Sequence, residues 1–392
     1  MHATEREKKR LVFIYSFIFS FRNIQRLRLH RKFYMQLIVK STHRLPRILV
    51  YVIAIVLGVI VSIFGINMFS LNNTDSTVFK QVKTFPIKDY VSELRNYSFP
   101  TSIQRNLIIT AAINTDLLSV YRFARSVRAS CSFCTLVMIM NKVTMSNYDF
   151  QELADVYSII YISEEDYFPA KLKKDRPDIT FIYFTRWIII KNFLSSLETQ
   201  GSIFDNVFIC DSHDSLFQKD IFTYMNNSNP GLYAFMEDVR MTIGTCPINS
   251  GWIQTCYGEK ELKKLFNKSI SCAGTVLGTW SATMLYLSAM ESEIITTSAS
   301  CKHTLGDQGL HNYIIHNNKI PNTTIHQISH EYGFVGTLGY AQWLKRNPFG
   351  LVLNANGSIY AVIHQWNRSK QMVTQFAREY QLIPANIRNK KQ

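Results

Sequence analysis

The 392-residue sequence lacks the patterns that mark three common enzyme classes. It contains neither the dinucleotide-binding pattern G-x-G-x-x-G nor the Walker pattern G-x-x-x-x-G-K-[ST], so a Rossmann dehydrogenase or a P-loop kinase is unsupported. The nucleophile elbow G-x-S-x-G is also absent, which disfavours the commonest hydrolase architecture. Charged residues make up only 18% of the chain and hydrophobic residues 47%, which excludes a disordered, collagenous or low-complexity protein.

The positive charge of the chain is concentrated at its N-terminus. The formal net charge is +15, and residues 1–47 contribute +10 of it, with twelve Lys or Arg against two Glu. An uncharged, proline-free apolar segment follows at 48–69 and is long enough to span the hydrocarbon core of a bilayer. It starts too late and runs too long for a cleaved signal peptide. By the positive-inside rule we predict a basic cytosolic tail at 1–47 and a single transmembrane signal anchor at 48–69, and we do not expect nucleic-acid binding.

Two further patterns indicate that the C-terminal bulk lies in the lumen of the secretory pathway. All Asn-x-Ser/Thr sequons follow the apolar segment, at Asn72, Asn96, Asn226, Asn267, Asn322, Asn356 and Asn367. All seven cysteines also follow it, which is consistent with an oxidising compartment. Because seven is odd, at least one thiol stays free, and we expect it to be Cys210, which lies in an apolar run. For Cys131 and Cys134 we expect a local disulfide or two buried thiols rather than half of a zinc site, because no second pair at metal spacing follows.

Beyond a polar stem at 70–104, short apolar runs alternate with helical patterns. We expect strands at 106–112, 135–140, 158–162 and 206–210, and helices at 115–129 (capped by Thr115), 150–157 and 186–197. This alternation predicts an α/β fold with a doubly wound parallel sheet, in which ligands bind beyond the carboxyl ends of the strands. Asp211 stands at one such end.

The segment after the fourth expected strand carries the residues best suited to chemistry. Asp211, His213 and Asp214 emerge together where an apolar run stops. Carboxylate oxygens are the ligands that hard divalent cations prefer, and such a cation can neutralise charge on a departing nucleoside diphosphate. An equally favoured alternative is a capping turn in which both carboxylates accept hydrogen bonds from nearby backbone amides.

Several motifs, taken in order, resemble one group of known proteins. They are Arg186-Trp187, the acidic corner D-S-H-D-S-L-F-Q, Asn249-Ser250-Gly251, Cys272-Ala273-Gly274-Thr275, Asp307-Gln308-Gly309-x-His311-Asn312 and a final V-I-H-Q-W-N-R around His364. On these motifs the chain resembles a type II membrane glycosyltransferase of the GT-A fold. In particular it resembles the nucleotide-diphospho-sugar transferase-like proteins, which are distantly similar to the glycogenin-like transferases. The resemblance covers roughly residues 105–370.

The resemblance implies a fold and a metal site. The fold is a GT-A-like doubly wound mixed sheet at 105–385, behind the single transmembrane helix. Asp211 and Asp214 would hold Mn²⁺ (or Mg²⁺), with His364 as third ligand. Asp211 would also contact the ribose and diphosphate of the donor, and His213 would donate to a phosphate. The carboxylates are three residues apart rather than the commoner two. Taken alone, a His after a strand is more often a hydrogen-bonding residue.

Other residues receive roles around the donor, each with a plainer alternative. The resemblance makes Asp307 and Gln308 acceptor-side or donor-sugar contacts; the alternative is a helix N-terminus at Asp307. Arg186 would pair with the diphosphate or else stack on Trp187. Candidate residues for close backbone approach to the sugar are Asn249 and Gly251, for which a plain turn is the alternative. Glu237 is a candidate base or acceptor-orienting group, although a solvated strand end is favoured.

These observations predict a metal-dependent glycosyltransferase that moves a sugar from a nucleotide-sugar, a UDP-sugar above all, to a hydroxyl of a glycan or glycoprotein. The predicted location is the Golgi or ER membrane, with a single span and a lumenal catalytic domain. A homodimer stays open as the assembly. The alternative is a catalytically inactive lumenal binding or scaffold protein with the same fold.

Overall fold

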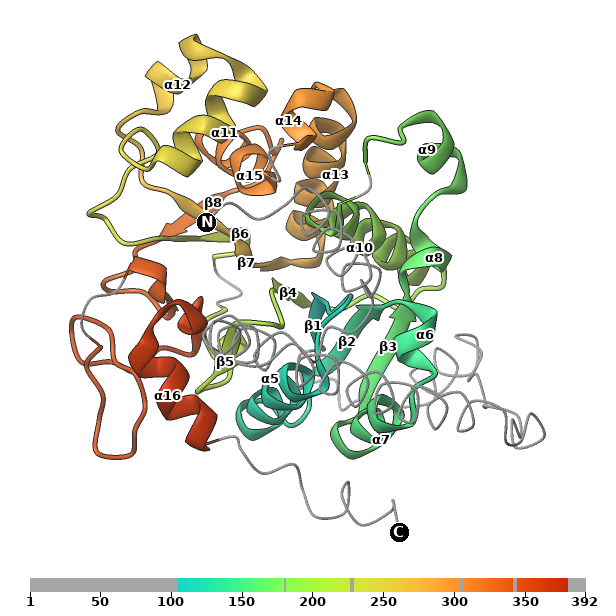
Figure 1. The fold of residues 1–392 in the computed structure, drawn as a ribbon, viewed down its shortest axis with the longest axis vertical. Helices are drawn as coiled ribbons and strands as arrows, with labels where there is room; N and C mark the ends of the chain where they lie inside the picture. Colours follow the sequence, from blue (N-terminus) through green and yellow to red (C-terminus); the bar gives the residue numbers. More distant parts are fainter. Residues whose placement is uncertain (1–104, 180, 226–228, 304–305, 341–343, 380–392) are drawn as a thin grey trace, which may run out of the picture. The chain divides into compact units, whose positions relative to one another are not determined.

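The computed structural model describes residues 105–379 except 180, 226–228, 304–305 and 341–343 (Figure 1). The predicted tail, signal anchor and stem at 1–47, 48–69 and 70–104 lie outside the described residues. None of the helices in the described part of the chain is both long and apolar enough to cross a membrane.

The described chain is a mixed α/β structure with ten strands in two sheets. The strands are β1 Asn106–Ala111, β2 Thr135–Met140, β3 Ile159–Ser163, β4 Asn206–Cys210, β5 Ser215–Phe217, β6 Leu232–Met236, β7 Ser271–Thr279, β8 Ile325–Ile328, β9 Val335–Thr337 and β10 Val362–His364. The α-helices are α5 Leu117–Ser130, α6 Lys142–Met145, α7 Tyr148–Tyr157, α8 Glu164–Tyr167, α9 Ala170–Asp175, α10 Ile182–Thr199, α11 Pro247–Tyr257, α12 Glu259–Leu265, α13 Trp280–Thr296, α14 Ala299–His303, α15 Asp307–His316 and α16 Lys370–Glu379. Three short 3₁₀ helices complete the elements: η2 Ile221–Tyr224, η3 Leu338–Tyr340 and η4 Trp366–Arg368.

The large sheet has seven strands in the order β3-β2-β1-β4-β7-β6-β8. The four strands that the apolar runs predict, β1 to β4, pair in parallel. Strand β7 runs antiparallel to both of its neighbours, β4 and β6, and β8 pairs in parallel with β6. The sheet is therefore mixed, as the resemblance implies, and its parallel half is the half that the strand–helix alternation predicts.

Helices cover both faces of this sheet (Figure 1). On one face α10, α13 and α15 pack together with inward residues such as Ile109 and Val207 in one hydrophobic cluster. On the other face α5 and the small sheet pack on alternate residues of the same strands, such as Ile108 and Phe208. Because neighbouring residues of a strand point to opposite faces, an apolar run without alternation is what a sheet buried on both sides requires.

The small sheet has three strands in the order β5-β10-β9. Four residues separate β4 from β5, and β5 pairs antiparallel with β10, which places His364 opposite Ser215. Strand β10 also pairs in parallel with β9. This pairing brings the C-terminal part of the chain to the corner that follows β4.

Two boundaries differ from the sequence-based prediction. The cap of α5 is Asp116 rather than Thr115, because the Asp116 carboxylate accepts a hydrogen bond from the Ser119 backbone N–H at 3.0 Å. Helix α10 begins at Ile182, four residues before the predicted start. It is apolar almost all round because it is buried between the sheet and α13.

All seven cysteines lie in the described residues, and four of them form disulfides. Cys131 pairs with Cys134, and Cys256 pairs with Cys301. The first pair confirms the expected local bridge, and the second links α11 to α14. The free thiols are Cys210, as predicted, and also Cys246 and Cys272, and all three are buried.

Phe208, at the centre of β4, is fully buried and contacts Phe217 and Phe235 edge-to-face. Phe208→Ala should lower the free energy of unfolding by about 3–5 kcal/mol, because it removes these contacts and leaves a cavity. Urea unfolding of the full-length protein measures the change. Val143→Ala, at a side chain that is 81% exposed, is the control and should stay within about 0.5 kcal/mol of the parent. A change at Phe208 no larger than in the control would contradict the described core.

Candidate functional site

The candidate site forms at the corner where β4 leaves the large sheet and β5 begins the small one. Asp211 directly follows β4, and its backbone N–H donates to the Gly274 carbonyl at 3.0 Å, which extends the pairing with β7. The Ser212 hydroxyl donates to the Ala111 carbonyl at the end of β1. Asp214 directly precedes β5. The two strands thus fix the backbone positions from which both carboxylates project.

Strand β10 brings His364 to the same corner. The His364 Nε2 atom lies 3.6 Å from Asp211 Oδ2 and 3.2 Å from Asp214 Oδ1. One ligand atom of each residue lies within 4.8 Å of the other two, so the three predicted metal ligands are neighbours. Which metal they would hold, and whether they do so, stays a prediction.

Two polar atoms in this cluster are buried without a hydrogen-bond partner. They are Asp214 Oδ1 and His364 Nε2, the two atoms 3.2 Å apart. At this distance the two atoms form an ion pair when the imidazole is protonated. A divalent cation that displaced the proton would bind both atoms, since carboxylate oxygen and imidazole nitrogen are ligands of such ions. The residues present therefore fit a metal.

Gly274 makes room for this arrangement. A Cβ atom at Gly274 would lie 2.5 Å from His364 Cε1, 2.6 Å from His364 Nε2 and 2.7 Å from Asp211 Oδ2. Any side chain on this residue of β7 would displace either the imidazole or the carboxylate. Gly274 appeared in the sequence only as part of a motif, and its contact with the cluster carried no sequence signal.

Cys272 orients the imidazole from its other side. The Cys272 sulfur lies 3.4 Å from His364 Nδ1, which leaves Nε2 directed at the carboxylates. Burial opposes a charge on His364, but the Cys272 sulfur and the carboxylates of Asp214 and Asp211 outweigh it and hold the pKa of His364 well above its usual range. Sequence reasoning assigned no role to Cys272, because nothing before folding indicates that it lies beside His364.

Arg186 joins the cluster to a second carboxylate. It reaches inward from α10 and forms ion pairs with Asp211 and, at 2.6 Å, with Asp307. Its guanidinium also lies over the Trp187 ring, 4.6 Å from the centroid, and the Trp187 indole N–H donates to Asp307 at 3.0 Å. The alternative prediction, that Arg186 stacks on Trp187, is thus confirmed. Pairing with a diphosphate stays a prediction.

The charged groups of this cluster shift one another's pKa values. Burial opposes the ionised form of Asp211, yet Arg186 and His364 outweigh burial and hold the pKa of the Asp211 carboxyl well below its usual range. Burial raises the pKa of Asp307, and Arg186 offsets this only in part. Because the Asp211 carboxylate bonds Arg186 and not a backbone amide, the capping-turn interpretation is wrong for Asp211.

A second polar group lies between β6, α11 and α15. The Gln308 amide donates to Glu237 Oε1 and to Asn249 Oδ1, both at 3.1 Å. Glu237 is 2% exposed, and burial raises its pKa, so the solvated strand end that the sequence favoured is wrong. Asp307 begins α15, so its alternative as a helix N-terminus is confirmed, and it also forms an ion pair with Arg186 that the sequence did not predict. A contact of Asp307 with the acceptor or the donor sugar stays a prediction.

Two predicted donor-binding residues lie in a helix rather than a turn, and a third lies outside the Asp211–Asp214–His364 cluster. Asn249 and Gly251 are in helix α11, so the turn interpretation of this motif is wrong. A Cβ atom at Gly251 would meet nothing within 4 Å, so the residue borders open space. His213 is at the same corner as Asp211 and Asp214, but its side chain is exposed and outside the three-residue cluster.

No family model and no curated protein matches the chain. Among solved structures, the galactosyltransferase LgtC in complex with donor and acceptor sugar analogues is 16% identical, with a TM-score of 0.40 over 72% of this chain and 99% of that one. The glycosyltransferase GlyE of Streptococcus pneumoniae TIGR4 is 13% identical, with a TM-score of 0.41 over 74% and 63%. Mouse xyloside xylosyltransferase 1 is 12% identical, with a TM-score of 0.39 over 68% and 99%. These similarities are distant, so the functional case depends on the residues of the site.

Gly274→Ala tests whether the close approach at β7 matters. The added methyl group should displace His364 or Asp211 and abolish any Mn²⁺-induced rise in the melting temperature of the full-length protein. Gly244→Ala is the matched control, because its methyl group would clash with the ring of Phe266, away from the cluster. The control should lose stability but keep its response to Mn²⁺. An unchanged response in Gly274→Ala would contradict the described geometry.

Proposed function

We propose that this protein is a metal-dependent glycosyltransferase that moves a sugar from a UDP-sugar to a hydroxyl of a glycan or glycoprotein. One observation carries the proposal. At the carboxyl end of β4, where α/β sheets bind their ligands, two carboxylates and an imidazole converge, with ligand atoms within 4.8 Å of one another. This donor set suits a divalent cation, and a cation at a strand end suits a diphosphate.

Asp211, Asp214 and His364 would hold the metal, which we propose to be Mn²⁺ or Mg²⁺. When bound, such a cation supplies Lewis-acid stabilisation of the negative charge on a diphosphate. Cys272 and Gly274 support this role without touching the ion: the sulfur orients the imidazole, and the bare backbone gives the imidazole space.

The surrounding residues have the properties that a donor needs. Arg186 is a buried cation beside Asp211, whose side chain is 32% exposed, and is suited to contact a diphosphate there. Gln308 holds the Glu237 carboxylate in one orientation. We propose that Glu237, Gln308 and Asp307 face the donor sugar or the acceptor hydroxyl, and that Asn249 and Gly251 on α11 border the sugar. His213, exposed at the corner, is proposed to donate to a phosphate.

We further propose that the enzyme acts in the lumen of the Golgi or ER, anchored by residues 48–69. The clustered positive charge before that segment supports this topology. The two disulfides are consistent with an oxidising compartment. The sequons at Asn267, Asn322 and Asn356 are exposed, as acceptors of N-linked glycans must be.

A second candidate is a lumenal binding or scaffold protein without turnover. The observation that favours it is the ion pair between Arg186 and Asp211. An internal cation can stabilise that carboxylate without a metal, so the corner could persist as a purely structural feature.

Incubation of the detergent-solubilised full-length protein with Mn²⁺ and a panel of UDP-sugars separates the two candidates. The enzyme should release UDP by slow donor hydrolysis, and Asp211→Asn or Asp214→Asn should lower the rate at least about a hundredfold, because each removes charge that holds the leaving group. Removal of the metal with a chelator should have the same effect.

Asp155→Asn is the matched control, since it removes an equal charge from an exposed residue of α7 and should leave the rate unchanged. If no donor is hydrolysed and UDP with Mn²⁺ does not raise the melting temperature, the scaffold candidate is correct. Hydrolysis that persists in both aspartate variants would place the metal elsewhere and overturn the proposed site.

A further inference from the structure

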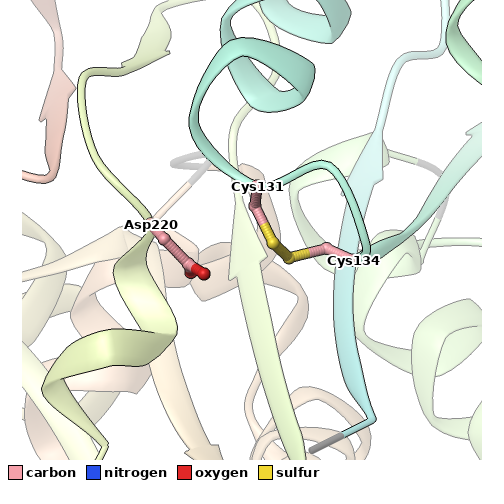
Figure 2. A group of neighbouring side chains, drawn as sticks. All are labelled: Cys131, Cys134 and Asp220. Atoms are coloured by element: carbon pink, nitrogen blue, oxygen red, sulfur yellow. A yellow bond between two sulfur atoms is a disulfide. The ribbon is translucent and has the colours of Figure 1, made fainter. Parts of the chain in front are cut away.

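A second group of metal-binding side chains lies away from the β4 corner. It consists of Cys131, Cys134 and Asp220, and one ligand atom of each lies within 4.8 Å of the other two. Figure 2 shows the Asp220 carboxylate directed at the disulfide between the two cysteines. The cysteines bracket the turn between α5 and β2, whereas Asp220 follows β5 and precedes η2.

Hydrogen bonds to backbone groups hold the turn that carries the two cysteines. The Arg128 guanidinium donates to the carbonyls of Cys134 at 2.6 Å, Tyr157 at 2.6 Å and Ser158 at 2.9 Å. The Cys131 N–H donates to the Val127 carbonyl at 2.7 Å. The turn is therefore tied to α5 and to the end of α7, and we expect it to keep its course when the disulfide is reduced.

Asp220 is fixed as well. Its Oδ1 atom accepts a hydrogen bond from the Phe222 backbone N–H at 2.9 Å, which leaves Oδ2 available. Phe222 and Ile221 belong to the same hydrophobic cluster as Cys131 and Cys134, so packing holds η2 against the turn. Burial raises the pKa of the Asp220 carboxyl.

Reduction of the disulfide changes the electrostatics around Cys131, Cys134 and Asp220. Two thiols would then face a carboxylate and the C-terminal end of α5, which carries partial negative charge. The Arg128 guanidinium offsets part of that field but is directed at backbone carbonyls. A divalent cation bound by both sulfurs and Asp220 would balance the charge. Thiolate ligands select zinc-like ions over Mg²⁺ or Ca²⁺, and three protein ligands are typical of zinc sites that keep an open position.

We propose that reduction of the Cys131–Cys134 disulfide creates a site for a zinc-like divalent cation, bound by both sulfurs and the Asp220 carboxylate. An external dithiol reduces the S–S bond and becomes a disulfide itself, which leaves two protein thiols. Binding of the cation then releases both thiol protons. The disulfide and the metal are mutually exclusive, so this corner responds to the redox state of its surroundings. The inference is independent of the proposed transferase activity.

Co²⁺ is the probe, because thiolate–cobalt bonds absorb light in a charge-transfer band that carboxylate–cobalt bonds lack. The experiment uses the full-length protein with Asp214→Asn, which removes one of the three candidate ligands of the other cluster. The reduced protein should gain the band, the oxidised protein should not, and Zn²⁺ should displace the cobalt. Cys131→Ser and Cys134→Ser should each abolish the band. Cys210→Ser and Cys246→Ser, at free thiols outside the site, should retain it.

Asp220→Asn separates the ligand role of this residue from its capping role. The amide oxygen can still accept the hydrogen bond from the Phe222 N–H, but the negative charge is gone. We therefore expect the affinity for cobalt to fall about tenfold or more and the melting temperature to stay unchanged. This variant keeps both thiols and remains informative even if a serine variant fails to fold. The proposal is overturned if the reduced protein shows no band, if the band survives in either serine variant, or if Asp220→Asn binds cobalt as tightly as its parent.

Discussion

The burial of charge at the end of β4 is the constraint on which the rest of the structure depends. Asp211, Asp214 and Asp307 gather there, and Arg186 is the permanent cation among them. Ionised groups taken out of water are costly unless they are paired, and removing one partner of such a group leaves an uncompensated charge. The raised pKa of His364 gives these carboxylates a second positive charge, and a divalent cation that displaced the imidazole proton would supply that charge in its place.

Each of the two sheets positions part of this corner. The large sheet fixes Asp211 through the β4–β7 pairing, whereas the small sheet delivers His364 through the β5–β10 pairing. Helices α10 and α15 add Arg186 and Asp307 from the face that they cover. No single element carries a complete site, and tertiary packing is what turns scattered polar residues into a cluster.

The sequence predicted the parallel half of the sheet well, because its strands are buried on both faces and appear as apolar runs between helical patterns. Strand β7 escaped prediction because Gly274, Gly278 and Thr275 interrupt its apolar character, and β9 is only three residues long. The motifs named the residues that converge at the corner, but their roles stay predictions. Neither Cys272 beside His364 nor Asp220 beside Cys131 had any local signal, since these contacts arise only from long-range packing.

The pairing of β10 with β5 has a consequence for the order in which the corner is assembled. Every other strand of the large and small sheets precedes it in the chain, so the corner lacks its imidazole until β10 has been synthesised and has paired with β5. A polypeptide that stops before β10 would carry the carboxylates of this corner but not His364. Capture of a cation by Asp211, Asp214 and His364 together would therefore report that β10 has docked.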